Sequence, residues 1–168
     1  MNTPSPQANT EVACRPIGYI RCRFAQPPGT PIQTIAAPKE IARLELLPAY
    51  AAGLRDVESF EYLILITHFH LCAQERLEVT PFLDVQSHGV FATRAPARPN
   101  RLGLSIVRLL RLDELTLHFA GTDRVDGTPV LDIKPYVPRF DVRDTQRIGW
   151  FAGRLEDLAC ARADDRMV

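Results

Sequence analysis

The sequence has few cysteines and no long apolar run, and each shortage excludes a class of protein. Cys14, Cys22, Cys72 and Cys160 are widely spaced and form no C-x-x-C pair, which argues against a secreted disulfide framework and against a clustered metal site. No apolar run approaches the roughly 18 residues of a membrane span. The polar start of the chain, residues 1–14, lacks the apolar segment of a signal peptide. We therefore expect a cytoplasmic protein with reduced thiols, a loose N-terminal tail, no membrane segment and no metal centre.

Lysine is also scarce, and the net charge is zero. The chain has 20 lysines and arginines against 20 acidic residues, which argues against non-specific coating of nucleic acid. Only Lys39 and Lys134 are lysines, so arginine supplies nearly all of the positive charge. We favour genomic base composition as the cause, and bidentate recognition of carboxylate or phosphate is the functional alternative. A local basic patch remains compatible with zero net charge.

Several active-site motifs are absent. No G-x-G-x-x-G follows a strand, so a Rossmann cofactor loop is unsupported, and no P-loop, H-E-x-x-H or G-x-S-x-G occurs. His68 and His70 have strand spacing and would face the same side, which could suit a metal. Because no suitable third ligand lies nearby, we favour a histidine hydrogen-bonded at the edge of a pocket.

The dominant hydrophobic period is two, which predicts strands. Residues 19–24 and 114–121 alternate apolar and polar side chains, as half-buried strands do. Residues 62–71 form a continuous apolar run, as expected of a strand buried on both faces. Residues 104–112 and 130–137 add two further strands.

Turns are frequent and helical patterns are few. The Asp-Gly pair at 126–127 predicts a tight hairpin. Residues 48–60 favour one or two helical turns, and residues 150–161 favour a helix that caps the domain. Together these patterns predict the mainly β class: a single closed or strongly curved antiparallel β-barrel with few short helices and no Rossmann fold. We expect a barrel domain over 15–152 and a helical cap or tail over 153–168.

Residues 89–106, GVFATRAPARPNRLGLSI, concentrate arginine and proline in one turn. Pro96 and Pro99 fix their own φ angles and restrict the preceding residues, and Asn100 can bond to the neighbouring backbone. Arginines in such a pre-organised loop suit an anionic ligand better than mobile ones do. A solvated surface hairpin stiffened by prolines is an equally weighted alternative.

The same region carries a resemblance to a known family. Residues 89–110, GVFATRAPARPNRLGLSIVRLL, and 124–138, RVDGTPVLDIKPYVP, resemble the TrmO/TsaA-type (YaeB-like) family of S-adenosylmethionine-dependent tRNA methyltransferases. Members of that family carry G-V-F-A-T-R-S-x-x-R-P-N-P-I-G-x-S and, downstream, D-G-T-P followed by D-I-K-P-Y-x-P. Further matches are PIGYIRCRF, LELLPAYAAGLRDVESFEYLILITHFH and RIGW, so the resemblance covers about residues 16–152.

This resemblance implies a function. It implies a β-barrel that binds S-adenosylmethionine, usually as a homodimer with the cofactor near the subunit interface. It also implies methylation of the exocyclic amine of threonylcarbamoyl-adenosine beside the tRNA anticodon. A non-catalytic module that binds S-adenosylmethionine or RNA is the alternative from another class. Carried over by motif, the cofactor site comprises Pro31, Ile32, Gln33, His70, Leu71, Arg94, Leu104, Asp126, Gly127, Thr128 and Pro129.

Roles for some of these residues follow from their chemistry. Arg94 would hold the cofactor's carboxylate, and backbone groups of the turn at 126–129 would bond the adenine or ribose. Leu104 would form an apolar wall. Phe91 or Tyr136 would favour the sulfonium through cation–π contact.

Catalysis and RNA binding draw on other candidates. His70 and Asp132 are the candidate general bases for the acceptor nitrogen, although Asp132 could equally pair with a cation such as Lys134. Arg98, Asn100 and Arg101 are the candidate contacts to tRNA phosphates. Arg108 and Arg111 differ in parity along one strand, which predicts that they face opposite ways.

Three departures from the family pattern bear on activity. Ile32 stands where members usually have arginine, so a positive charge near the cofactor or RNA is missing. Arg101 replaces the second proline of R-P-N-P. The sequence also ends before the second, C-terminal domain that better-known bacterial members carry. These changes affect expected tRNA specificity more than expected cofactor binding.

Overall fold

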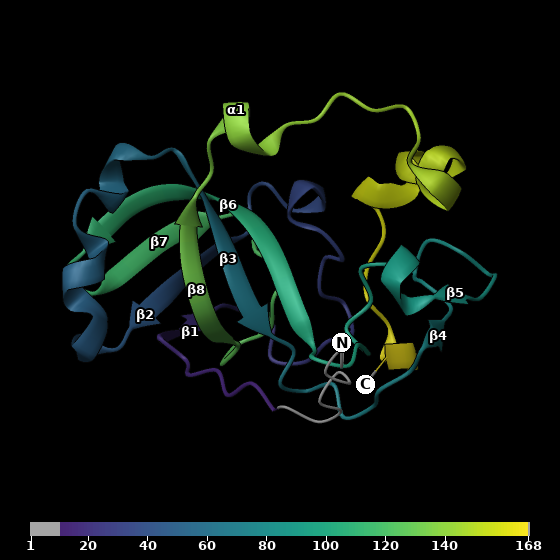
Figure 1. The fold of residues 1–168 in the computed structure, drawn as a ribbon, viewed down its shortest axis with the longest axis horizontal. Coiled ribbons are helices and arrows are strands. Elements are labelled where there is room, and N and C mark those ends of the chain that lie inside the picture. Colours follow the sequence, from purple (N-terminus) through teal and green to yellow (C-terminus); the bar gives the residue numbers. More distant parts are fainter. Residues whose placement is uncertain (1–10, 168) are drawn as a thin grey trace, which may run out of the picture.

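Six antiparallel strands close into a barrel in the computed structural model, which describes residues 11–167 (Figure 1). Their order around the barrel is β1-β2-β7-β6-β3-β8, and β8 pairs back onto β1. The predicted mainly β, closed antiparallel barrel is confirmed. The strands are β1 (Gly18–Arg21), β2 (Ile41–Leu46), β3 (Tyr62–His68), β6 (Leu102–Asp113), β7 (Thr116–Ala120) and β8 (Pro129–Pro135).

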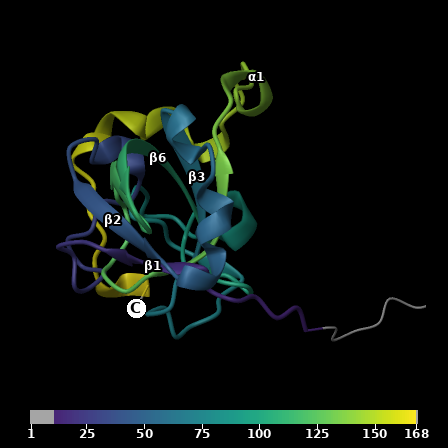
Figure 2. The same ribbon diagram turned by 90° about the vertical axis from the view of Figure 1, so that its left-hand side faces the viewer.

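The remaining regular structure is short. A two-stranded sheet, β4 (Glu78–Val79) with β5 (His88–Gly89), lies outside the barrel. The helix α1 (Pro138–Asp141) follows β8 and projects from the end of the barrel (Figure 2). Short 3-10 turns span Thr34–Ala36, Pro48–Leu54, Val57–Ser59, Val90–Ala92, Gly149–Gly153, Leu155–Ala159 and Asp165–Met167. The helix expected over 150–161 is therefore two separate 3-10 turns, because Gly153 ends the first of them.

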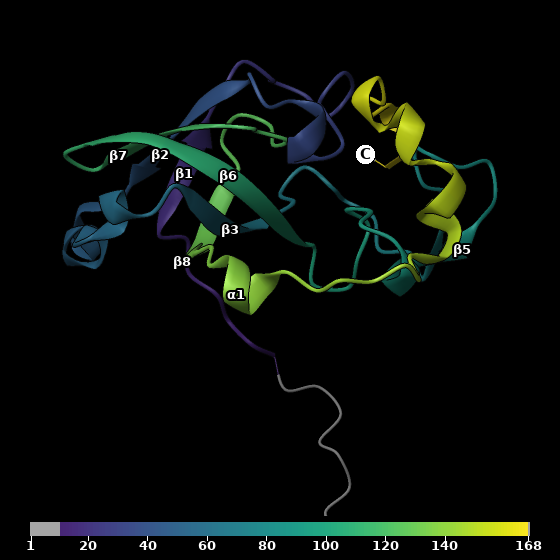
Figure 3. The same cartoon turned by 90° about the horizontal axis from the view of Figure 1, so that it is seen from above.

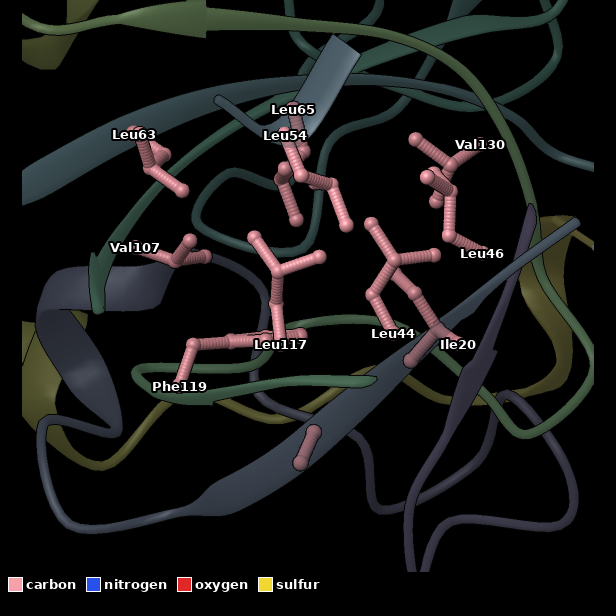
Figure 4. Packing of buried hydrophobic residues seen from close by; sticks show 11 residues of the cluster. Ile20, Leu44, Leu46, Leu54, Leu63, Leu65, Val107, Leu117, Phe119 and Val130 are labelled. Atoms are coloured by element: carbon pink, nitrogen blue, oxygen red, sulfur yellow. The ribbon is translucent and has the colours of Figure 1, made fainter. Parts of the chain in front are cut away.

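Alternation along the strands builds the core. Every second residue of β3 and β7 points into the barrel, and the inward side chains interdigitate there (Figure 4). Burial of these apolar groups is the main favourable contribution to folding. The buried cluster comprises Ile20, Ala42, Leu44, Leu46, Leu54, Leu63, Leu65, Val107, Leu117, Phe119 and Val130.

The strand β2 was not among the predicted strands, although its residues alternate as strictly as those of β7. Ala42, Leu44 and Leu46 are buried, and β2 connects β1 to β7 in the barrel. The Asp-Gly hairpin prediction is wrong in its topology. The turn at 126–127 precedes β8, but β7 and β8 pair with other strands and not with each other.

A β-bulge in β6 overturns the parity argument for its two arginines. Arg108 pairs with Ala120 of β7, whereas Arg111 pairs with His118, so one extra residue is inserted between them. A bulge leaves two residues of one strand opposite one residue of its partner, which reverses the alternation. Arg108 and Arg111 are consequently both exposed, and the former pairs with Glu61 while the latter pairs with Asp113.

The two ends of the chain differ in how they are held. Residues 11–14 are exposed and have no regular structure, while the rest of the predicted tail, residues 1–10, lies outside the described residues. After α1 the chain passes to the side of the molecule that carries β4 and β5, and its last turns lie beside β5 (Figure 3). Among residues 11–167, no helix is long and apolar enough to cross a membrane.

Gly18 offers a direct test of the β1–β2 packing. A Cβ at Gly18 would lie 2.5 Å from the Glu45 carbonyl oxygen and 2.9 Å from a Leu44 methyl carbon, so backbone would have to shift. We expect Gly18→Ala to lower the free energy of unfolding by about 1–3 kcal/mol, measured by urea denaturation. Gly53→Ala is the control, because a Cβ there meets nothing within 4 Å. Equal stability of the two variants would contradict the packing.

Candidate functional site

A cavity of about 830 Å³ lies beside the barrel, between its end and the C-terminal segment. This volume falls within the range of about 300–1,000 Å³ that is typical of small-molecule sites. Most of the lining is apolar, and a few charged groups converge on it. The walls come from selected residues within the segments 27–35, 69–72, 81–83, 93–98, 102–104, 123–128 and 148–164.

The arginine-rich turn forms one wall and is not a solvated hairpin. Thr93, Ala95 and Ala97 are buried, and the two alanines pack in a second apolar cluster with Cys72, Val79 and Val90. Burial of every second residue holds this irregular backbone against the rest of the chain. The alternative of a surface hairpin is therefore wrong.

Two arginines of this turn have different environments. Arg98 Nη1 donates to the carbonyl oxygens of Thr93 at 2.9 Å and Val90 at 3.1 Å, so this guanidinium braces its own loop. Arg94 is exposed at the cavity, and its Nη1 donates to Gln33 Oε1 at 2.8 Å. Arg94 therefore presents the more available positive charge, while Gln33 orients it.

A buried polar network forms the floor of the cavity. Arg124 Nη1 lies 3.1 Å from Asp123 Oδ1, and Arg124 Nε donates to Thr67 Oγ1 at 2.9 Å. Ser105 donates to Asp123 at 2.7 Å, and the Arg124 guanidinium stacks on Phe69 with 4.8 Å to the ring centroid. Desolvation raises the pKa of the Asp123 carboxyl, while Arg124 and Ser105 act in the opposite direction.

The network also explains a glycine at the start of β6. A Cβ at Gly103 would lie 2.6 Å from Thr67 Oγ1 and 2.7 Å from Arg124 Nη2. The absent side chain thus leaves room for the Arg124 guanidinium beneath the cavity.

His70 lies in the turn after β3, close to the Asp-Gly turn. A Cβ built at Gly127, whose φ is +75°, would lie 3.9 Å from His70 Nε2. Partial burial, followed by the nearby His68, lowers the pKa of His70 from its usual value of 6.5. Because β3 ends at His68, the predicted strand spacing of the two histidines does not hold. Among the described residues, no group of three or more His, Cys, Asp or Glu side chains is placed to hold a metal ion.

The Asp-Gly turn is tied to β1. Asp126 accepts a hydrogen bond from the Cys22 backbone N–H at 3.1 Å and lies 3.7 Å from Arg21 Nη1. Thr128 Oγ1 donates to the Val125 carbonyl oxygen at 2.7 Å. These bonds set the backbone of the turn at the edge of the cavity.

The sequence of this site matches a known family. Residues 19–142 match the model of the tRNA-methyltransferase O N-terminal domain. The chain belongs to the TrmO N-terminal domain family. A Pyrococcus abyssi protein named "Probable S-adenosyl-L-methionine-binding protein" is 47% identical over 155 residues, which cover 92% of this chain and 84% of that protein.

Other relatives are longer than this chain. The crystal structure of TrmO from Pseudomonas aeruginosa matches with a TM-score of 0.71 and 38% identity, over 84% of this chain and 63% of that one. The mouse tRNA (adenine(37)-N6)-methyltransferase is 33% identical over 135 residues, which cover 75% of this chain and 31% of that protein. The chain thus spans less than two thirds of both proteins.

Most of the residues predicted for the cofactor site lie at one cavity. Asp126, Gly127 and Pro129 belong to the adjoining turn and are not among the described residues that line the cavity. The substituted position, Ile32, does line it, so the missing positive charge concerns this site directly. The predicted residues that line the cavity are Pro31, Ile32, Gln33, His70, Leu71, Arg94, Leu104 and Thr128.

Asp132 lies apart from this cavity. It sits on β8 opposite Ile66 of β3, and its Oδ2 is 2.7 Å from Lys134 Nζ. The pairing with Lys134, which was the structural alternative for this carboxylate, is what the structure contains.

The candidate RNA contacts and aromatic partners are spread more widely. Arg98 lines the cavity, whereas Asn100 and Arg101 lie outside its lining, and Arg101 Nη2 donates to the Ala73 carbonyl oxygen at 3.2 Å. Phe91 is 76% exposed beside Arg98, and Tyr136 packs edge-on against Tyr62; neither aromatic ring lines the cavity.

Two groups of cavity residues were not predicted from the sequence. Arg124 begins the segment 124–138 that resembles the family and Asp123 precedes it, and that adjacency was the available signal. Trp150 and Phe151 were assigned only to a capping segment, although the RIGW match included the tryptophan. Both groups meet the cavity only because distant segments fold together.

Proposed function

We propose that this chain is an S-adenosylmethionine-dependent methyltransferase that modifies the exocyclic amine of threonylcarbamoyl-adenosine next to the tRNA anticodon. The supporting observation is that eight of the eleven motif residues carried over from the TrmO family line one cavity of suitable volume. The names of several relatives refer to S-adenosylmethionine binding or to tRNA methylation.

The residues present fit this cofactor chemically. The exposed Arg94 guanidinium suits the carboxylate of the amino-acid end, because charge-assisted hydrogen bonds to arginine are strong and directional. Leu71 and Leu104 supply apolar surface for the uncharged parts. Backbone groups around Thr128 would bond the ribose or adenine. When bound, S-adenosylmethionine supplies the methyl group, and the chain's task is to hold the acceptor nitrogen in line with it.

His70 is the better of the two candidate bases. It lines the cavity, and its lowered pKa keeps the imidazole neutral at pH 7, so that Nε2 can accept the proton of the acceptor amine. Asp132 is held by Lys134 outside the lining, which assigns it a structural role in this proposal.

The partners in the proposal are tRNA and a second copy of the chain. Leu102 and Leu104 line the cavity and also start an exposed apolar row on β6 that continues to Ile106, with Leu110 exposed beyond Arg108. A homodimer that covers this row would also cover one side of the cofactor site. Arg101 and Asn100 lie next to the same edge and would face the phosphates of tRNA.

The proposal retains the expected division of the chain, with a tail over 1–14, a barrel domain over 15–152 and a cap over 153–168, and places it in the cytoplasm. The second candidate function is a non-catalytic S-adenosylmethionine- or RNA-binding module. Ile32 favours this candidate, because it lines the cavity where the family pattern has an arginine. Turnover on threonylcarbamoylated tRNA would separate the two.

Arg94→Ala tests the cofactor site. We expect the variant to bind S-adenosylmethionine about tenfold more weakly or worse, because a hydrogen bond to a charged group contributes about 1.5–3 kcal/mol. Isothermal titration calorimetry measures this, and methyl transfer from labelled cofactor to threonylcarbamoylated tRNA measures turnover. Arg55→Ala is the control, since Arg55 is exposed and does not line the cavity. If S-adenosylmethionine does not bind to the wild-type protein, the proposed function is wrong.

A further inference from the structure

The cavity has a wall that lies beyond the family domain. The family model ends at residue 142, yet the segment that follows α1 contributes much of the apolar lining. Five of its side chains face the cavity: Ile148, Trp150, Phe151, Leu155 and Leu158. We name these five residues the C-terminal wall.

Independent contacts hold the C-terminal wall at both ends. Near its start, Trp150 Nε1 donates to the Ala92 carbonyl oxygen at 2.8 Å and the indole stacks on His88 at 4.8 Å. Arg154 Nη2 lies 3.2 Å from the buried Asp84 carboxylate.

Beyond the wall, Ala163 exchanges two backbone hydrogen bonds with the loop around Gly29 and Thr30, at 2.8 and 2.9 Å. The segment is thus fastened across the cavity, from the arginine-rich turn to the loop that carries Pro31 (Figure 3).

The side chains of the C-terminal wall line the cavity and are not part of the apolar core. None of the five belongs to either buried apolar cluster, and Leu155 remains 49% exposed. Apolar side chains that line a cavity gain burial when a ligand covers them, and this burial stabilises the complex. We propose that the C-terminal wall is part of the donor subsite, where it covers the apolar surface of S-adenosylmethionine and slows its release. This inference rests on the proposed function.

The sequence supplies a reporter for this site. Trp150 is the only tryptophan in the chain and lines the cavity, so its emission reports on ligand at the wall. The test uses the full chain, S-adenosylmethionine as the probe, calorimetry for the Kd and stopped-flow Trp150 fluorescence for the dissociation rate.

The decisive variant is Leu155→Ser/Leu158→Ser, and Glu156→Gln is its matched control. Glu156 lies in the same 3-10 turn, is exposed and does not line the cavity. We expect the double variant to raise the Kd about tenfold or more, mainly through faster dissociation, and the control to match wild type. An unchanged Kd and an unchanged dissociation rate in the double variant would overturn the proposal that the C-terminal wall is part of the donor subsite.

A second variant guards against misfolding of the first. Arg154→Gln leaves the lining unchanged but breaks the ion pair with Asp84, and it should speed dissociation several-fold. Thermal unfolding curves verify that each variant is folded. If wild type shows no binding heat, the proposed function fails and the role of the C-terminal wall fails with it. If wild type binds and the folded double variant behaves like it, or Arg154→Gln does so where the double variant does not fold, only the role of the C-terminal wall fails.

Discussion

Asp123→Ala is expected to lower the free energy of unfolding by about 3–5 kcal/mol, because it leaves the buried Arg124 guanidinium without its anionic partner. The substitution also removes the acceptor of the Ser105 hydroxyl. Water cannot replace these interactions easily, since all three side chains are buried. Urea denaturation at neutral pH measures the loss.

Two other variants separate the ion pair from a general effect of removing a carboxylate. Asp123→Asn keeps an oxygen for the Ser105 hydrogen bond and should cost less than Asp123→Ala. Asp132→Asn breaks only the half-exposed pair with Lys134 and should cost less than about 1 kcal/mol. A loss in Asp123→Ala as small as that in Asp132→Asn would contradict the network as a stabilising element.

His70→Ala is expected to lower kcat for methyl transfer by about 10²–10⁴-fold, the usual contribution of a positioned general base. The imidazole must be neutral to accept a proton, and the pKa of His70 lies below its usual value of 6.5. For the wild type, kcat/KM should therefore fall as the pH drops through a value below 6.5. The variant should lose this acid limb in a pH–rate profile on threonylcarbamoylated tRNA.

Matched variants assign the effect to His70. His118→Ala is the control, because that ring lies on β7 beside Arg111 and does not line the cavity. It should leave both kcat and the acid limb unchanged. If His70→Ala retains the limb while Asp132→Asn abolishes it, the base is Asp132 and the assignment made here is wrong.

The strand pattern shows how far local sequence carries the fold. Alternation in β7 and the apolar run of β3 were sufficient to predict these two strands. The prediction that β3 is buried on both faces is wrong, because only every second residue of β3 is buried and the residues between are partly or fully exposed. Residues 42–46 of β2 alternate in the same way, with Ala42, Leu44 and Leu46 buried. The bulge in β6 could not be read from spacing, because an inserted residue is detectable only against the partner strand β7.

The candidate site, like the fold, could be predicted only in part from local sequence. The motif residues from Arg94 to Leu104 were predicted together because they are neighbours in sequence. Which arginine is available was not predictable, since Arg98 is engaged by two carbonyl oxygens and Arg94 is not. For Asp132 the sequence left two roles open, a general base or a partner of Lys134 two residues along β8, and the structure contains the pair with Lys134.

By itself, the sequence determined the family, the mainly β class and most of the motif residues that line the cavity, because short-range alternation and contiguous motifs encode these features. Only the tertiary structure decided that Asp123 and Arg124 form the cavity floor and that Trp150 joins its wall. The physical reason is that burial, ion pairing and cavity shape depend on contacts between segments far apart in the chain. Local sequence patterns do not show which distant segments come into contact.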